Sequence, residues 1–281
     1  MNSEKSKLQK VQTTQQNNFT MLNIPTIPDE LLPKVTIVTP TYNRQLLFEI
    51  AVRNYKSFNY PRDKLYWIIY DNSDNDSLKE QIPQNDPTIQ YHHSKTKECI
   101  GKKRNILADL CKTDVIVHMD DDDYYYPDSV KIRVCALIAY KKEISGCIQY
   151  NCYNIVDDSQ FIASGTEDRM NIGEASLCYY KEYYINNPFN ENDCYEESVN
   201  FIRGNIQKYI DIPCSFILLS ITHGFNTSGR KSLMPVLDFS FLDLLTVSDL
   251  EYIKSLKLKL MNSDVNNKIA FETIEKLKKS K

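Results

Sequence analysis

The segment Val115–Val130 reads VIVHMDDDDYYYPDSV and places four consecutive aspartates directly after an apolar run. Neighbouring carboxylates repel each other by about 3 kcal/mol per pair at a separation of ~6 Å and an effective dielectric constant near 20. A buried strand seldom ends in this way for structural benefit alone. The segment therefore predicts that a positively charged group lies at the end of this strand.

Two earlier apolar runs also end in polar clusters. Val35–Val38 leads into PTYNR, and Leu65–Tyr70 leads into DNSDND. Helical spacing of apolar residues is found between the strands, over Arg44–Ser57 and again in CIGKKRNILADLCK. Alternating strands and helices of this kind predict an α/β fold with a Rossmann-like, mostly parallel sheet flanked by helices. Such sheets bind ligands at the carboxyl ends of their strands, so the three polar clusters are expected to form one site.

The pattern changes after Pro127. We expect a helix over 127–142, strands over 147–155, 161–164 and 174–180, two short helices over 181–187 and 194–204, and a strand that begins at Cys214. The last forty or so residues predict two amphipathic helices, which could pair two subunits as a homodimer or pack on the sheet. The expected division is a disordered or extended leader at 1–32, a catalytic domain at 33–235 with halves meeting near residue 130, and a helical extension at 236–281.

Composition excludes several classes of protein. The chain of 281 residues carries 34 Lys and Arg against 37 Asp and Glu, so no basic field favours nucleic acid. The 8 cysteines form no CxxC pair, which favours free thiols in a reducing compartment over a zinc cluster or a dense disulfide framework, with one or two bridges left open. The polar N-terminus and the lack of a long apolar run predict neither a secretory signal nor a transmembrane span, and hence a cytoplasmic protein, in a host cytoplasm if it is viral.

The aspartate run has the chemistry of a metal site. If the strand continued through it, Asp120 and Asp122 would share one side and Asp121 and Asp123 the other. Paired carboxylates at an open strand end suit Mg²⁺ or Mn²⁺, whose shell is then completed by the phosphate oxygens of a substrate. The alternative is a solvated acidic turn. The apolar strand before the run and the aromatic residues and proline after it favour the metal site.

Four segments together carry a resemblance to a known family. VTIVTPTYNR, IIYDNSD, IGKKRNIL and IVHMDDDDYYYP resemble, in this order and on these elements, the inverting glycosyltransferases of family 2, which have the GT-A fold. The resemblance covers roughly residues 34–230, and no single segment would suffice for it. It implies a metal-dependent enzyme that moves a sugar from a nucleotide diphosphate, with UDP favoured, to a hydroxyl on a glycan, protein or lipid.

The resemblance implies roles for residues on the donor side. In the D-x-D pair, Asp120 would face the ribose and Asp122 would ligate the metal, while Asp123 supports them and Asp121 is a less direct participant. The other donor-binding residues that it implies are Pro40, Thr41 and Arg44 in the first loop, Asp71 at the base, and Lys103 and Arg104 at a basic helix start. Solvated charges on a helix face are the alternative for the last two. Because YDNS replaces the family's DDGS, Tyr70 takes an acidic position, and base identity is not fixed by this motif.

On the acceptor side, YEES resembles the family's x-E-D motif. Glu197 is then the general base that takes the acceptor proton, and Glu196 supports the acceptor or the helix. Acidic residues also stabilise the first turn of helices, which is the structural alternative. In SITHGFNTSGR, His223 is expected to complete the metal or diphosphate site, and Arg230 to clamp the diphosphate. His118 is expected to be a core residue, and His92 and His93 receive no role.

Two other classes of function remain open on the residues alone. A sugar nucleotidyltransferase shares the sheet and the metal, but it opens with a glycine-rich loop, and TPTYNRQL has no glycine. A non-catalytic module that binds a nucleotide sugar or calcium would keep the aspartates without needing Glu197 or His223.

Overall fold

The computed structural model describes residues 23–74, 77–164, 172–223, 226, 233–236 and 240–262. A central sheet of seven strands has the order β10-β6-β9-β4-β1-β2-β3. Its strands are β1 (Val35–Thr41), β2 (Leu65–Asp71), β3 (Ile89–His93), β4 (Val115–His118), β6 (Ile144–Gly146), β9 (Cys178–Tyr180) and β10 (Tyr209–Asp211). All pairs in it are parallel except those that β9 makes with β4 and β6. The predicted mostly parallel α/β sheet is therefore confirmed.

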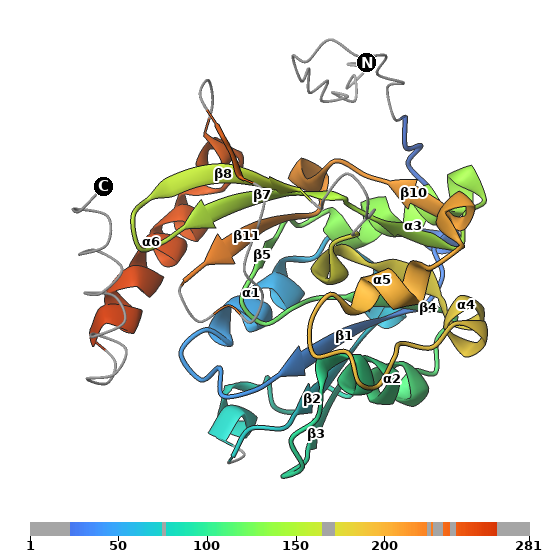
Figure 1. Ribbon diagram of the computed structural model, residues 1–281, viewed down its shortest axis with the longest axis horizontal. Coiled ribbons are helices and arrows are strands. Elements are labelled where there is room, and N and C mark those ends of the chain that lie inside the picture. The colour runs from blue at the N-terminus through green and yellow to red at the C-terminus, as the bar shows by residue number, and fades with distance from the viewer. Residues whose placement is uncertain are drawn as a thin grey trace, which may run out of the picture.

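A second sheet of five strands has the order β12-β8-β7-β11-β5 and lies beside the first (Figure 1). Its strands are β5 (Tyr124–Tyr125), β7 (Gln149–Asn154), β8 (Ser159–Ser164), β11 (Leu218–Thr222) and β12 (Leu233–Pro235). The helices of the molecule are α1 (Glu49–Ser57), α2 (Ile100–Leu110), α3 (Ser129–Tyr140), α4 (Lys181–Asn186), α5 (Glu197–Ile202) and α6 (Val247–Asn262). None of the described helices is long and apolar enough to cross a bilayer.

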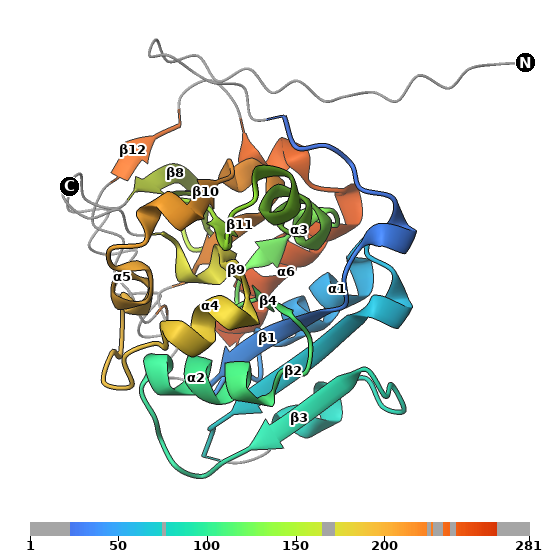
Figure 2. The ribbon, with the colours of Figure 1, turned by 90° about the vertical axis from the view of Figure 1, so that its right-hand side faces the viewer.

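Side chains that alternate along the central strands separate two cores. Ile37, Trp67 and Val117 face one side of the sheet, where they pack with residues of α1 and α3. Val38 and Ile116 face the other side, where they pack with residues of α2, α4 and α5. Both faces are covered by helices, as Figure 2 shows, which explains why β1 is buried along its whole length and β2 along nearly all of it. Because both faces are covered, polar side chains can cluster only at the ends of the strands.

The C-terminal helix α6 belongs to the body of the protein. Ile253, Leu256 and Leu260 are buried in a cluster with Ile50 of α1 and Leu219 of β11. Of the two roles that sequence left open for this apolar stripe, packing on the body is the one observed. The second expected C-terminal helix and most of the leader lie outside the described residues.

The strand expected over 174–180 was only half right. Its first part is a 3₁₀ turn, Glu174–Ser176, and only Cys178–Tyr180 pairs with the sheet. The Glu174 side chain accepts hydrogen bonds from the amide (3.4 Å) and hydroxyl (2.9 Å) of Ser198, in α5. This contact brings a further carboxylate to the start of α5.

One buried side chain connects α1 to the segment that carries the aspartates. Asn54 donates to the Asp123 carbonyl (2.8 Å) and accepts from the Tyr125 amide (3.1 Å). Both backbone groups are buried, so their hydrogen bonds must be made within the protein.

We predict that Asn54→Ala lowers the free energy of unfolding by about 2–5 kcal/mol, because it leaves a buried donor and a buried acceptor unsatisfied. Urea unfolding measures the change. Asn59→Ala is the matched control, since Asn59 bonds to Asp128 at an exposed position, and it should cost less than about 1 kcal/mol. Equal losses in the two variants would contradict the assignment.

Candidate active site

The four aspartates occupy the turn between β4 and β5, and they do not continue the strand. Arg44 contacts two successive carboxylates, with Nε 3.7 Å from Asp121 Oδ1 and Nη2 3.6 Å from Asp122 Oδ2. The expected alternation of sides is therefore wrong, because strand geometry ends at His118. Arg44, from the PTYNR segment, places one positive charge at this strand end, and the divalent cation expected there stays a prediction.

Asp121 and Asp123 are the two most buried members of the run. Burial raises the pKa of Asp121 above its ordinary range, against the lowering effect of Arg44. Asp123 Oδ1 accepts from the amide of Ile221 in β11 at 2.9 Å. Asp123 thus holds the turn against the second sheet, which is the supporting role that the resemblance implied for it.

Asp122 faces a histidine from the end of β11. Its Oδ2 lies 3.0 Å from Nε2 of His223, whose side chain has no solvent exposure. A carboxylate and an imidazole form a donor set that suits Mn²⁺. The described residues contain no group of three or more His, Cys, Asp or Glu side chains arranged for a metal. Two protein ligands fit a cation whose other positions are filled by substrate phosphate oxygens and water.

Helix α2 contributes two buried cations. Lys103 donates to the Thr41 carbonyl at 3.1 Å, and burial lowers the pKa of Lys103 to about 8. Arg104 is 2% exposed. Its Nη2 lies 2.9 Å from Asp120 Oδ1 and its Nε 3.1 Å from Glu197 Oε1. The alternative of solvated charges on a helix face is therefore wrong for both residues.

The other donor-side residues lie at the ends of β1 and β2. Pro40 and Thr41 are the last residues of β1, and Asp71 is the last residue of β2. Asp71 is fully buried, and its carboxylate accepts from Ser73 and from the Tyr91 hydroxyl at 2.8 Å. These bonds hold the turn after β2. Recognition of a base by Asp71 stays a prediction.

Glu197 begins helix α5 and is 4% exposed. Burial raises the pKa of this carboxyl, the Glu174 carboxylate raises it further, and Arg104 lowers it. A carboxylate with a raised pKa accepts a proton more readily, which suits a general base. Glu196 precedes it in the left-handed region, with φ of 54°. Sequence reasoning missed Glu174, because only the fold brings it to this helix.

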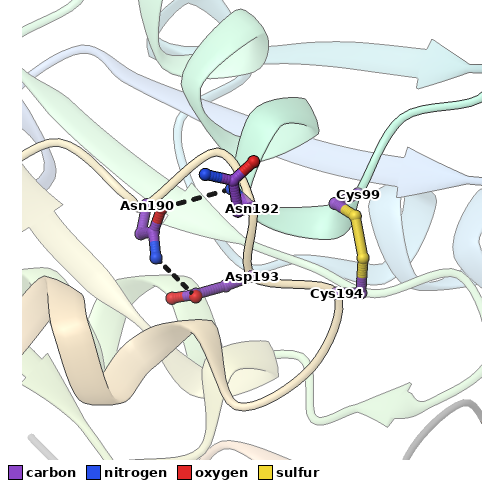
Figure 3. The surroundings of a disulfide bond; sticks show 5 residues. All are labelled: Cys99, Asn190, Asn192, Asp193 and Cys194. Carbon is purple, nitrogen blue, oxygen red and sulfur yellow. Dashed lines mark hydrogen bonds between the residues drawn. A yellow bond between two sulfur atoms is a disulfide. The ribbon is translucent and has the colours of Figure 1, made fainter.

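The loop that precedes Glu197 is fastened to the start of α2. A disulfide joins Cys99, directly before α2, to Cys194, three residues before Glu197 (Figure 3). The Gly101 amide donates to the Asp193 carbonyl at 2.9 Å, and a Cβ at Gly101 would lie 2.1 Å from the Asn190 carbonyl oxygen. Only glycine allows this approach.

This pairing bears on the expected state of the cysteines. The expectation of free thiols fails at Cys99 and Cys194, while the other six cysteines are free and buried. Disulfides persist in oxidising compartments, so this bond weighs against a reducing one. The two cysteines are far apart in sequence, and their spacing carries no motif that could have predicted the pair.

His118 lies in the core, as sequence indicated. His118 has no exposure, its Nδ1 lies 2.9 Å from the Glu174 carbonyl, and burial lowers its pKa. It is a core residue.

Arg230, the expected diphosphate clamp, lies outside the described residues.

Similarity to solved structures defines the fold class. The chain is similar to a mannosyltransferase from Pyrobaculum calidifontis in complex with GDP-Man and Mn²⁺, with a TM-score of 0.55, 16% identity, and coverage of 71% of this chain and 60% of that one. It is also similar to S. aureus TarS 1–349 in complex with UDP-GlcNAc, with a TM-score of 0.55, 12% identity, and coverage of 84% and 69%. The fold is accordingly GT-A.

Residues 36–209 match the family described as Glycosyl transferase family 2, and the chain belongs to this family. It is 25% identical to a chondroitin synthase from Escherichia coli over 217 residues, which are 71% of this chain and 30% of that protein. It is 27% identical over 95 residues to a GalNAc(5)-diNAcBac-PP-undecaprenol beta-1,3-glucosyltransferase from Campylobacter jejuni, covering 33% of this chain and 30% of that protein. The matches thus span about a third of the length of these curated relatives.

We predict that the denatured, unreduced protein contains six reactive thiols and that reduction raises the number to eight, as a thiol titration would measure. Cys194→Ser should lower the free energy of unfolding by about 2–4 kcal/mol, because the unfolded chain loses a long closed loop. Reductant should destabilise the wild type and leave this variant unchanged. Eight thiols before reduction would contradict the pairing.

Proposed function

We propose that this chain transfers one sugar, with inversion, from a nucleotide diphosphate donor to a hydroxyl of a glycan or lipid acceptor. Among nucleotide sugars, we propose a UDP-sugar as the donor. Membership in the family supports a glycosyltransferase. The similar proteins include a chondroitin synthase and a GalNAc(5)-diNAcBac-PP-undecaprenol beta-1,3-glucosyltransferase, and the similar solved structures are complexes with GDP-Man and with UDP-GlcNAc.

The observation that carries the proposal is the meeting of two carboxylates from different halves of the chain. Asp120 follows β4 in the predicted nucleotide-binding half, and Glu197 begins α5 in the predicted acceptor half. Both form ion pairs with the guanidinium of Arg104, at 2.9 and 3.1 Å. A module that only binds a nucleotide sugar has no need for Glu197 at this place.

In the proposed reaction Glu197 takes the proton of the acceptor hydroxyl while that oxygen attacks the anomeric carbon. Attack comes from the face opposite the diphosphate, so one base is sufficient and no covalent nucleophile is required. Arg44, Lys103 and Asp120 bind and orient the donor, and holding both substrates in line removes much of the entropic barrier. A divalent cation held by Asp122 and His223 supplies Lewis-acid stabilisation of the leaving diphosphate when it is bound.

We predict that Glu197→Gln lowers kcat for sugar transfer by about 10²–10⁴-fold and leaves the affinity for the donor near that of the wild type. Because burial raises the pKa of Glu197, the ionised base is lost as pH falls through this raised value. The acidic limb of kcat/KM should therefore lie well above about 4.3, the ordinary pKa of a glutamate.

The matched control for that variant is Glu196→Gln, which changes the neighbouring carboxyl and should cost far less in kcat. Transfer and donor binding are measured separately, by product formation and by calorimetry. A Glu197→Gln variant with full activity would remove Glu197 from the role of base.

We predict that Mn²⁺ increases the melting temperature of the protein in the presence of a bound nucleotide-sugar donor, since a ligand of the folded state stabilises it by mass action. A panel of nucleotide sugars screened in this way identifies the donor. EDTA should remove both the shift and the activity.

Two variants locate the metal. Asp122→Asn should abolish the Mn²⁺-dependent part of the shift, whereas Glu197→Gln should retain it. A shift that survives in Asp122→Asn would place the cation elsewhere, and transfer unaffected by EDTA would contradict metal dependence.

A further inference from the structure

Arg104 forms ion pairs both with a carboxylate predicted for the donor side, Asp120, and with the proposed base, Glu197. It lies on α2 and is 2% exposed, so its charge depends almost wholly on protein partners. The guanidinium places Nη2 2.9 Å from Asp120 Oδ1 and Nε 3.1 Å from Glu197 Oε1. A planar group with several N–H donors can hold two carboxylates at once in a defined relative orientation, whereas an ammonium is a point charge.

The surroundings of Glu197 explain why this contact matters for a base. Glu174 lies near it on the 3₁₀ turn before β9, and Asp120 lies near it after β4; both repel its charge. Arg104 is the cation that opposes them. An unpaired carboxylate with so little exposure would take up a proton, because burial strongly disfavours its charged form.

Lys103 provides a contrast within the same helix. Its ammonium donates to the Thr41 carbonyl at the end of β1 and, within the described part of the chain, forms no ion pair with Glu197. The two neighbouring cations therefore serve different sides of the site, Lys103 the donor side and Arg104 the junction between the sides.

We propose that Arg104 is a positioning residue that orients the Glu197 carboxylate relative to the donor-side Asp120. This inference rests on the proposed function. It differs from the role that sequence resemblance implies, in which Arg104 is a cation that faces the nucleotide. The Nη1 group of Arg104 is buried and has no hydrogen-bond partner among the described residues. If Arg104 instead faced the nucleotide, replacing it would weaken the affinity for the donor, which is a distinct prediction.

The experiment compares Arg104→Gln and Arg104→Lys with the wild type, using donor and acceptor titrations over a range of pH. We expect kcat to fall about 10²-fold in Arg104→Gln, the scale of loss that a misplaced group causes, with the donor KM close to that of the wild type. The acidic limb of the pH profile of kcat/KM should move to higher pH, because the cation that favours the charged form of Glu197 is gone. Arg104→Lys should keep the limb nearer its original place but recover only part of kcat.

Glu174→Gln gives the opposite sign and serves as the matched variant. It removes the repelling charge near Glu197 and keeps an oxygen that can accept from Ser198, so the acidic limb should move to lower pH. This variant also keeps the test decisive if Arg104→Gln does not fold. An acidic limb that stays in place in Glu174→Gln would show that Glu197 is not the group that ionises, and it would overturn the proposal.

A rise in the donor KM of Arg104→Lys with unchanged kcat and an unmoved limb would also overturn it, in favour of the nucleotide-facing role. Failure of the proposed function is distinguishable from both results. In that case the wild type itself transfers no sugar with any donor of the panel, whereas here the wild type is active and only the behaviour of the variants decides.

Discussion

The placement of two arginines against four carboxyl groups, those of Asp120, Asp121, Asp122 and Glu197, is the constraint on which this site depends. Asp120, Asp121 and Asp122 stand in one turn, where mutual repulsion would open it in the absence of cations. Arg44 approaches from the segment after β1 and Arg104 from α2, and each bonds to members of the turn. Both arginines come from elements that flank the central strands. The charges are therefore held in place only when the parallel sheet is complete.

The second sheet also contacts the aspartate turn. The amide of Ile221 in β11 donates to Asp123, and β11 pairs with β5, directly after the aspartates. His223 follows one residue after the same strand and meets Asp122. The aspartate turn is thus fixed from three directions. A change in the register of β11 would displace both His223 and the Ile221 amide from which Asp123 accepts, so binding chemistry and packing are inseparable here.

Sequence reasoning reached the fold because the evidence for it is local. Continuous apolar strands such as Leu65–Tyr70 and helical spacing in Arg44–Ser57 predict a covered parallel sheet, and the end of a parallel strand is a known location for a ligand. The same reasoning brought Asp122, His223 and Glu197 into one hypothesis. The structure places Asp122 beside His223, and Glu197 beside Arg104.

Sequence reasoning did not predict the contacts between segments that are distant in the chain. The sides on which the aspartates point depend on where β4 ends, and a count of alternating residues assumed that the strand continued. The contact of Glu174 with α5 and the bond between Cys99 and Cys194 join segments that are close only after folding. No periodicity reports such pairs. Their positions follow from the antiparallel entry of β9 and from the passage of the 189–194 loop along α2.

The close passage of that loop over Gly101 has a mechanical consequence. The disulfide and hydrogen bonds between α2 and the loop restrict relative movement of the helix that carries Lys103 and the segment that leads to Glu197. If occupancy of the donor side shifts α2, α5 must follow. Thermodynamic linkage then requires that the acceptor alter the affinity for the donor by the same factor as the donor alters that for the acceptor. Binding of the two substrates would thus be coupled through the backbone without direct contact between them.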